Sequence, residues 1–200
     1  MTILEFNPKI RTKTTYQVPI IFGDIKYEQK KIFSYTIFNN KSASEIRFNT
    51  KNVFVYKFGE DNFLSELNEY KTEKELNKRT KFELISKEEK NIKFRDWTPG
   101  NGDGNHCSFE FDEDEKIWRF SFHRVDSFLG YQISGEVSLN KMGDFEEERY
   151  FQFDNQKRGK ELKWVLVNEY EYFNNKLDEV ANYILENGWN LPNTMKEYFI

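Results

Sequence analysis

Much of the chain alternates apolar and polar residues, which is the pattern of a β-strand with one buried face. Phe33, Tyr35 and Ile37, for example, alternate with Ser34 and Thr36. The segments between such runs are short and polar, which favours antiparallel hairpins over strand–helix–strand crossovers. We therefore expect strands over residues 16–22, 31–38, 45–48, 53–56, 82–86, 92–97, 107–111, 117–122, 128–139, 149–153 and 162–167.

One hairpin can be predicted residue by residue, with its turn at residues 113–116. Aromatic residues fall on one face of the two strands and polar residues on the other. A shift of one residue would set polar side chains against aromatic ones, so the pattern determines the register. The expected apolar pairs are Phe111–Trp118, Phe109–Phe120 and Cys107–Phe122. The expected polar pairs are Glu110–Arg119, Ser108–Ser121 and His106–His123. The next strand should place Tyr131 beside Phe120 and Gln132 beside Arg119, and should continue the polar face to Glu136.

Residues 61–79 have the features of a helix instead. Asp61 is a favourable N-cap residue, and the segment that follows is rich in Glu, Lys and Leu. Phe63, Leu67 and Tyr70 would share one face of this helix. The segment therefore predicts a helix whose first half packs against the rest of the protein.

A second helix is expected near residues 169–187, because Gly188 provides a C-terminal stop. Together these elements predict an α+β fold, in which a large curved antiparallel sheet is covered on its aromatic face by the C-terminal helix. We expect one domain over residues 1–200, with residues 1–50 either integral to it or a separate β-rich subdomain. The apolar residues of the C-terminal helix, at spacings of three and four, are Tyr170, Phe173, Leu177, Val180 and Ile184.

From Val53 onward, the order of predicted elements resembles the helix-grip folds of the START and Bet v 1 type. The order is a strand, a helix, a long antiparallel series and one long C-terminal helix. The resemblance covers about three quarters of the chain and depends on element order alone, because no motif supports it. It implies a cavity between sheet and helix that binds a small apolar ligand.

Composition excludes several classes of protein. Aromatic residues make up 18% of the 200 residues and charged residues 32%, which is unlike collagen or a low-complexity tail. No apolar run approaches the about 20 residues of a membrane-spanning helix, and no signal sequence is visible at the N-terminus, although one could already have been removed. A single cysteine, Cys107, cannot form an internal disulfide, which fits a cytoplasmic protein.

The net charge of −4 conceals an asymmetry between the two halves of the chain. Residues 1–100 hold 19 basic and 14 acidic residues, whereas residues 101–200 hold 11 basic and 20 acidic residues. An acidic surface repels nucleic-acid phosphates and favours basic protein partners. The acidic residues expected to bind such a partner are Asp103, Asp112, Glu113, Asp114, Glu115, Asp144, Glu146, Glu147 and Glu148.

Catalytic and metal-binding patterns are weak. His106 and His123 would face each other near Glu110, which could form a proton-transfer or metal site but more often marks surface histidines. The glycine-rich residues 98–105 lack the elements of a phosphate-binding loop and the turn glycine of a calcium-binding loop. Alternation places Cys107 on the aromatic face, where a thiol is buried and unreactive. We expect no cofactor and no metal.

The sequence thus favours a non-enzymatic cytoplasmic protein that binds and inhibits a basic partner, in the manner of an immunity protein against a toxin. The support is compositional: a small acidic protein with acidic loops and no complete catalytic motif. The alternative is a helix-grip-like domain that binds a small apolar ligand. An enzyme that uses the two histidines is the third hypothesis. The oligomeric state does not follow from the sequence.

Overall fold

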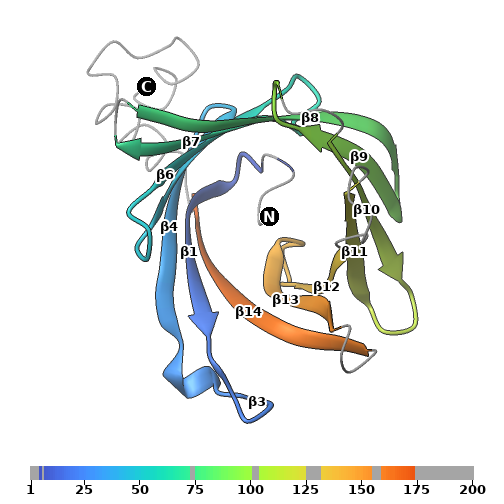
Figure 1. Cartoon of the computed structure of the whole chain (residues 1–200). Helices are drawn as coiled ribbons and strands as arrows, with labels where there is room; N and C mark the ends of the chain where they lie inside the picture. The colour runs from blue at the N-terminus through green and yellow to red at the C-terminus, as the bar shows by residue number, and fades with distance from the viewer. Residues whose placement is uncertain are drawn as a thin grey trace, which may run out of the picture.

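The computed structural model describes residues 5, 7–72, 75–100, 104–124, 132–154 and 159–173. Twelve antiparallel strands form a closed barrel in the order β1-β14-β13-β12-β11-β10-β9-β8-β7-β6-β5-β4, and β4 pairs with β1 to complete it (Figure 1). The strands are β1 (Ile10–Val18), β4 (Lys31–Asn39), β5 (Ser42–Arg47), β6 (Val53–Phe58), β7 (Leu64–Thr72), β8 (Glu75–Glu88), β9 (Asn91–Trp97), β10 (Asn105–Asp112), β11 (Ile117–Arg124), β12 (Gln132–Leu139), β13 (Phe145–Asp154) and β14 (Gly159–Tyr172).

The predicted α+β class is therefore wrong, because the described residues form strands and no α-helix. The segment expected as a helix near 61–79 supplies β7 and the first five residues of β8. Its helix-like spacing has a local cause: the register of β6 and β7 shifts at Phe58, so Leu64 and Leu67 both contact the core although they are three residues apart. Helix propensity is a weak preference that strand pairing overrides here.

The prediction of a C-terminal helix near 169–187 is wrong for its first residues. Residues 169–172 end β14, where Tyr170 and Tyr172 alternate with exposed residues and pack against the core. Residues 174–187 of the predicted helix lie outside the described part of the chain. The aromatic face of the sheet lines the inside of the closed barrel instead.

The predicted β10–β11 hairpin is confirmed pair by pair. Phe109 lies opposite Phe120, and Glu110 lies opposite Arg119. Ser108 and Ser121 form a hydrogen bond between their hydroxyls of 2.9 Å on the outer face. The register predicted for the next strand is wrong by four residues: Glu136 of β12, and not Gln132, lies opposite Arg119. Gln132 lies opposite His123 instead.

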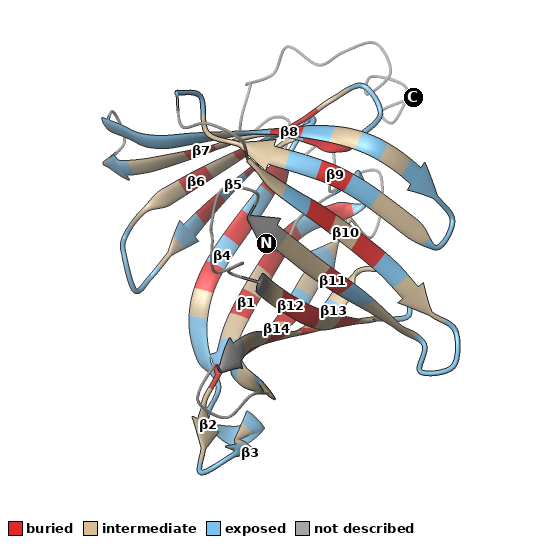
Figure 2. Cartoon of the chain, turned by 45° about the vertical axis from the view of Figure 1, so that its right-hand side comes forward, coloured by how far each residue is buried: buried red, intermediate tan, exposed pale blue. Residues whose placement is uncertain are grey.

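Aromatic rings fill much of the barrel beside these strands. The centroids of Phe109 and Phe120 are 5.3 Å apart, and those of Phe120 and Tyr150 are 5.2 Å apart. Figure 2 shows buried and exposed positions alternating along the strands, as a barrel wall requires. Gly135 lies opposite Phe120, and a Cβ atom there would come within 2.2 Å of the Phe120 ring. The absence of a side chain at Gly135 therefore makes room for the ring.

Strand β4 places polar side chains inside the barrel and large apolar ones outside, which is the reverse of an ordinary half-buried strand. Ser34 and Thr36 are fully buried in the barrel, whereas Tyr35 and Ile37 on the outer face are 36% and 47% exposed. Ile46, opposite Tyr35 on β5, is also exposed on this outer wall. The interior beside β4 is consequently polar, and this part of the barrel positions the site described below.

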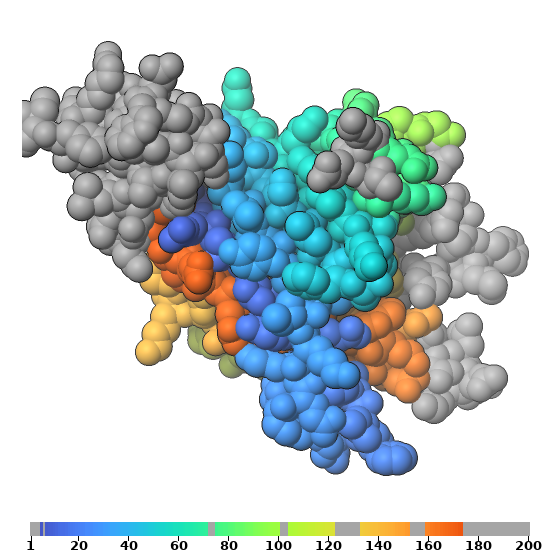
Figure 3. Space-filling model, turned by 90° about the vertical axis from the view of Figure 1, so that its left-hand side faces the viewer, coloured from blue at the N-terminus to red at the C-terminus, as the bar shows by residue number. Residues whose placement is uncertain are grey.

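An arm leaves the barrel between β1 and β4 (Figure 3, blue, at the bottom). It contains β2 (Ile20–Ile21), β3 (Asp24–Ile25) and the 3₁₀ turn η1 (Tyr27–Gln29). The hydroxyl of Tyr27 donates a hydrogen bond of 2.8 Å to Glu147 on the outer face of β13. The η1 turn therefore contacts the outside of the barrel, whereas β2 and β3 project beyond it (Figure 2). No described helix is long and apolar enough to cross a membrane.

Candidate functional site

A buried charged cluster lies on the inner wall formed by β14, β1, β4 and β5. Cross-strand pairing forms one continuous row of neighbours across five strands. In order around the barrel, the row contains Tyr170, Lys13, Thr36, Glu45 and Phe54. The side chains of paired residues in an antiparallel sheet point to the same face. Lys13 and Glu45 therefore both project inward, and at most 1% of the surface of each is exposed.

Hydrogen bonds fix the Glu45 side of the cluster. Its carboxylate accepts a bond of 3.2 Å from Nε of Arg47 and another from the hydroxyl of Tyr56. The Arg47 guanidinium also stacks on the Phe54 ring, 3.8 Å from its centroid. Burial opposes ionisation of Glu45, but Arg47 and Lys13 outweigh burial and hold the pKa of Glu45 below its ordinary value.

A second buried carboxylate, Glu148 of β13, completes the cluster. It accepts hydrogen bonds from Nδ2 of Asn168 at 2.8 Å and from the hydroxyl of Tyr150 at 2.5 Å. Burial lowers the pKa of Lys13, while attraction to Glu148 and Glu45 opposes this effect. Two cations and two carboxylates thus balance one another inside the barrel: Lys13 and Arg47, Glu45 and Glu148.

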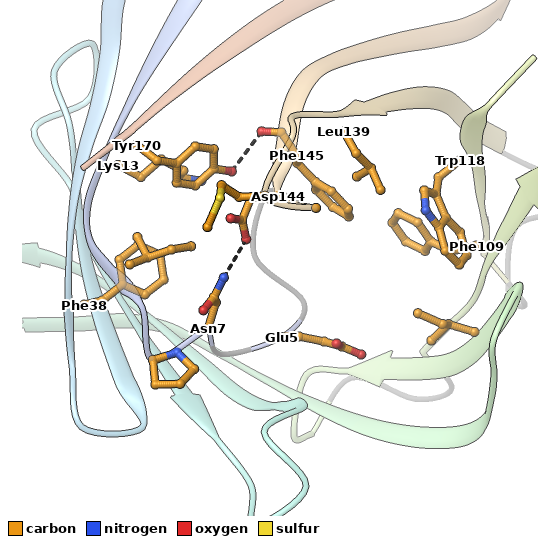
Figure 4. A pocket seen from close by; sticks show the side chains of 15 residues that line it. Glu5, Asn7, Lys13, Phe38, Phe109, Trp118, Leu139, Asp144, Phe145 and Tyr170 are labelled. Carbon is orange, nitrogen blue, oxygen red and sulfur yellow. Dashed lines mark hydrogen bonds between the residues drawn. The ribbon is translucent and has the colours of Figure 1, made fainter. Parts of the chain in front are cut away.

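A pocket of about 400 Å³ adjoins this cluster, because Lys13 belongs to both (Figure 4). The pocket lies at the end of the barrel that holds the β12–β13 turn. We call it the Asp144 pocket. Tyr170 and Lys13 lie on one side of it, and Phe109 and Trp118 lie on the other. Its full lining is Glu5, Asn7, Pro8, Ile10, Lys13, Phe38, Ile92, Phe109, Trp118, Leu139, Met142, Gly143, Asp144, Phe145 and Tyr170.

The β12–β13 turn aims Asp144 into this pocket. Asn140 holds the turn, because its side-chain oxygen accepts a bond of 3.0 Å from the backbone N–H of Asp144. Gly143 has a φ of +86°, a conformation that glycine adopts readily. The Asp144 carboxylate then accepts bonds from Asn7 at 3.0 Å and from the Tyr172 hydroxyl at 2.8 Å.

Glu5, Asn7 and Pro8, which precede β1 in the chain, line part of the Asp144 pocket. Glu5 forms an isolated β-bridge with Phe63 and an ion pair of 2.5 Å with Lys87. The backbone carbonyl of Lys9 accepts a bond from Phe173 at the end of β14. The pocket walls are therefore held in place by bonds within the protein.

The predicted acidic binding residues do not form one surface. Asp144 lines the pocket and Glu148 is buried in the cluster, whereas Glu147 faces outward and binds Arg149 at 2.6 Å. Glu146 is exposed. At the β10–β11 turn, Asp112 and Glu115 bind Arg119, Glu113 binds Lys90, and Asp114 is exposed; Asp103 lies outside the described residues. The binding of a basic protein partner stays a prediction.

The two histidines pair in register, His106 on β10 with His123 on β11. The His106 side chain is exposed, and Glu110 is exposed on the same outer face of β10. Cys107 is buried among the aromatic residues, and burial raises the pKa of its thiol. Among the described residues, no group of three or more His, Cys, Asp or Glu side chains could hold a metal ion.

Sequence reasoning missed the charged members of the interior site other than Asp144 and Glu148. Lys13, Glu45 and Arg47 were not singled out, because charged residues are almost always exposed unless they are paired. The available signal was the alternation in β4, where two hydroxyl residues repeat at the positions that face inward.

The fold and the site together define a closed twelve-stranded barrel with an internal charged cluster and a pocket at one end. No protein-family model, curated protein or solved structure matches this chain.

Proposed function

We propose that this protein binds a small molecule with an aromatic or apolar body in the Asp144 pocket. The observation that carries the proposal is the pocket itself, a hollow of about 400 Å³ at the mouth of the barrel. Ligand sites are typically concave, measure roughly 300–1,000 Å³, and combine apolar walls with a few fixed polar groups. Barrel mouths are among the places where such sites occur.

The walls supply the apolar part of this recognition. Phe38, Phe109, Trp118, Leu139 and Phe145 line the pocket. The rings of Phe109 and Phe145 are stacked, with centroids 6.1 Å apart and planes at 14°. Such a surface favours a flat apolar ligand, because burying ring faces removes a large area from water.

The polar groups are fixed before a ligand arrives. Asp144 is held by Asn7 and Tyr172, and the hydroxyl of Tyr170 donates a bond of 2.8 Å to the carbonyl of Phe145. A preformed site avoids part of the ordering cost of binding. This proposal keeps the small-ligand function that the sequence suggested as an alternative and replaces its helix-grip cavity with the interior of a barrel.

A fluorescence titration with the neutral probe N-phenyl-1-naphthylamine tests the proposal. The probe should bind with one site per chain, and Ile92→Trp should abolish binding because Ile92 lines the pocket. The matched control is Ile85→Trp on β8, since Ile85 is 55% exposed and does not line the pocket. Absence of binding, or equal binding by both variants, would overturn the proposal.

A further inference from the structure

We infer that the ligand of the Asp144 pocket is a cation, a protonated amine attached to an aromatic or apolar body. This inference rests on the proposed function and specifies its ligand class. It follows from two properties of the pocket, its uncompensated charge and its aromatic walls.

The charge of the pocket is negative once the paired groups are set aside. Its lining contains three ionisable side chains with formal charge, Glu5, Lys13 and Asp144. Glu5 is neutralised by Lys87 at 2.5 Å. Lys13 is fully buried and belongs to the balanced cluster, so it adds no net positive charge to the pocket.

Asp144 remains without a cation among the described residues. Its two oxygens accept hydrogen bonds from Asn7 and Tyr172, which are both neutral donors. A carboxylate oxygen has two lone pairs, so each oxygen can accept a further bond. A bond from an ammonium group would be charge-assisted and stronger than the two bonds present.

The neighbouring tyrosines reflect the same negative field. Burial and then the charges of Glu148 and Asp144 raise the pKa of Tyr170. Burial, together with the bond to Asp144, raises the pKa of Tyr172 to about 12. Each of these phenols is therefore neutral at physiological pH and does not add to the charge that a ligand would meet.

The aromatic walls favour a cation for a separate reason. The face of an aromatic ring carries partial negative charge and attracts a cation placed over it. Figure 4 shows Asp144 projecting into the pocket between Phe38 and Tyr170 on one side and Phe109 and Trp118 on the other. An amine bound to Asp144 would therefore lie among rings, and its own apolar body would stack on the Phe109 side.

Three indoles of similar size and different charge test the inference: tryptamine, indole-3-ethanol and indole-3-acetate. Competition with N-phenyl-1-naphthylamine should give tryptamine the highest affinity, about tenfold above the alcohol, with the acetate weakest. The preference should fall as salt is added. Equal affinities, or preference for the acetate, would overturn the inference while leaving the proposed function intact. Failure of the naphthylamine probe itself to bind would contradict the proposed function.

Two variants place the preference at Asp144. Asp144→Asn should reduce the advantage of tryptamine over indole-3-ethanol to about twofold or less and should leave the affinity for the alcohol nearly unchanged. Glu60→Gln is the matched control, because Glu60 is an exposed carboxylate on the β6–β7 connection at the same end of the barrel. A tryptamine preference that survives Asp144→Asn would overturn the assignment to Asp144.

Discussion

Replacement of Lys13 by Met should destabilise the barrel strongly, although methionine fits the same space. Lys13 is fully buried and interacts electrostatically with both Glu148 and Glu45. Removing one partner of a buried ion pair typically costs about 3–5 kcal/mol, because a charge is left unpaired in a poorly solvated site.

The structure indicates the lower part of that range. After the substitution, Glu45 would keep Arg47 and Tyr56, so its charge would remain paired. Glu148 would keep only neutral donors, Asn168 and Tyr150. We therefore expect a loss of about 3 kcal/mol in the free energy of unfolding, which arises mainly at Glu148.

Equilibrium unfolding in urea, followed by circular dichroism, measures this loss. Lys93→Met, at an exposed position on β9, serves as the control and should stay within about 0.5 kcal/mol of the unmodified protein. The double variant Lys13→Met/Glu148→Gln should cost less than the sum of its single changes, by about 1–3 kcal/mol. A Lys13→Met cost under about 1 kcal/mol, or strictly additive changes, would contradict the electrostatic pairing of Lys13 with Glu148.

Three further predictions concern the core and the cluster. Gly135→Ala should cost more than about 2 kcal/mol in urea unfolding, because the new Cβ would lie 2.2 Å from the Phe120 ring and 2.3 Å from the carbonyl oxygen of Arg149; a neutral result would contradict the packing. Cys107, whose pKa is raised by burial, should react with Ellman's reagent at pH 8 only after unfolding, and rapid reaction of the folded protein would contradict its burial. The pKa of Glu45 is lowered in the folded protein, so its ionisation should contribute stability that is present above pH 4.5 and lost as the pH falls through the folded-state pKa. Glu45→Gln should therefore make the free energy of unfolding less dependent on pH in the acid range. An unchanged pH dependence would contradict the pairing of Glu45 with Arg47 and Lys13.

Local pattern was sufficient to predict part of this fold. The β10–β11 hairpin followed from its own residues, because aromatic and polar faces alternate strictly from Cys107 to Phe122 and permit one register. The segment near Leu64 and Leu67 misled the same reasoning, because a register shift in a strand imitates helical spacing. A shift of this kind depends on the partner strand and cannot be deduced from β7 alone.

Closure of the barrel and the interior site depend on contacts that are distant in sequence. Strand β1 pairs with β14, and Lys13 is brought beside Tyr170 by that pairing. Only when the sheet closes does the polar face of β4 become the inside of the barrel, where Thr36 connects Lys13 with Glu45 in one row. Asp144 could be noticed as one of a run of acidic residues, but its position in a pocket depends on this closure.

Intermolecular nuclear Overhauser effects between bound tryptamine and the protein would show where the ligand binds. We expect contacts from the indole ring to Phe109, Phe145 and Trp118 inside the Asp144 pocket. Contacts confined to the outer wall, at Tyr35 and Ile46, would contradict this expectation and would assign ligand binding to the exposed apolar surface of β4 and β5.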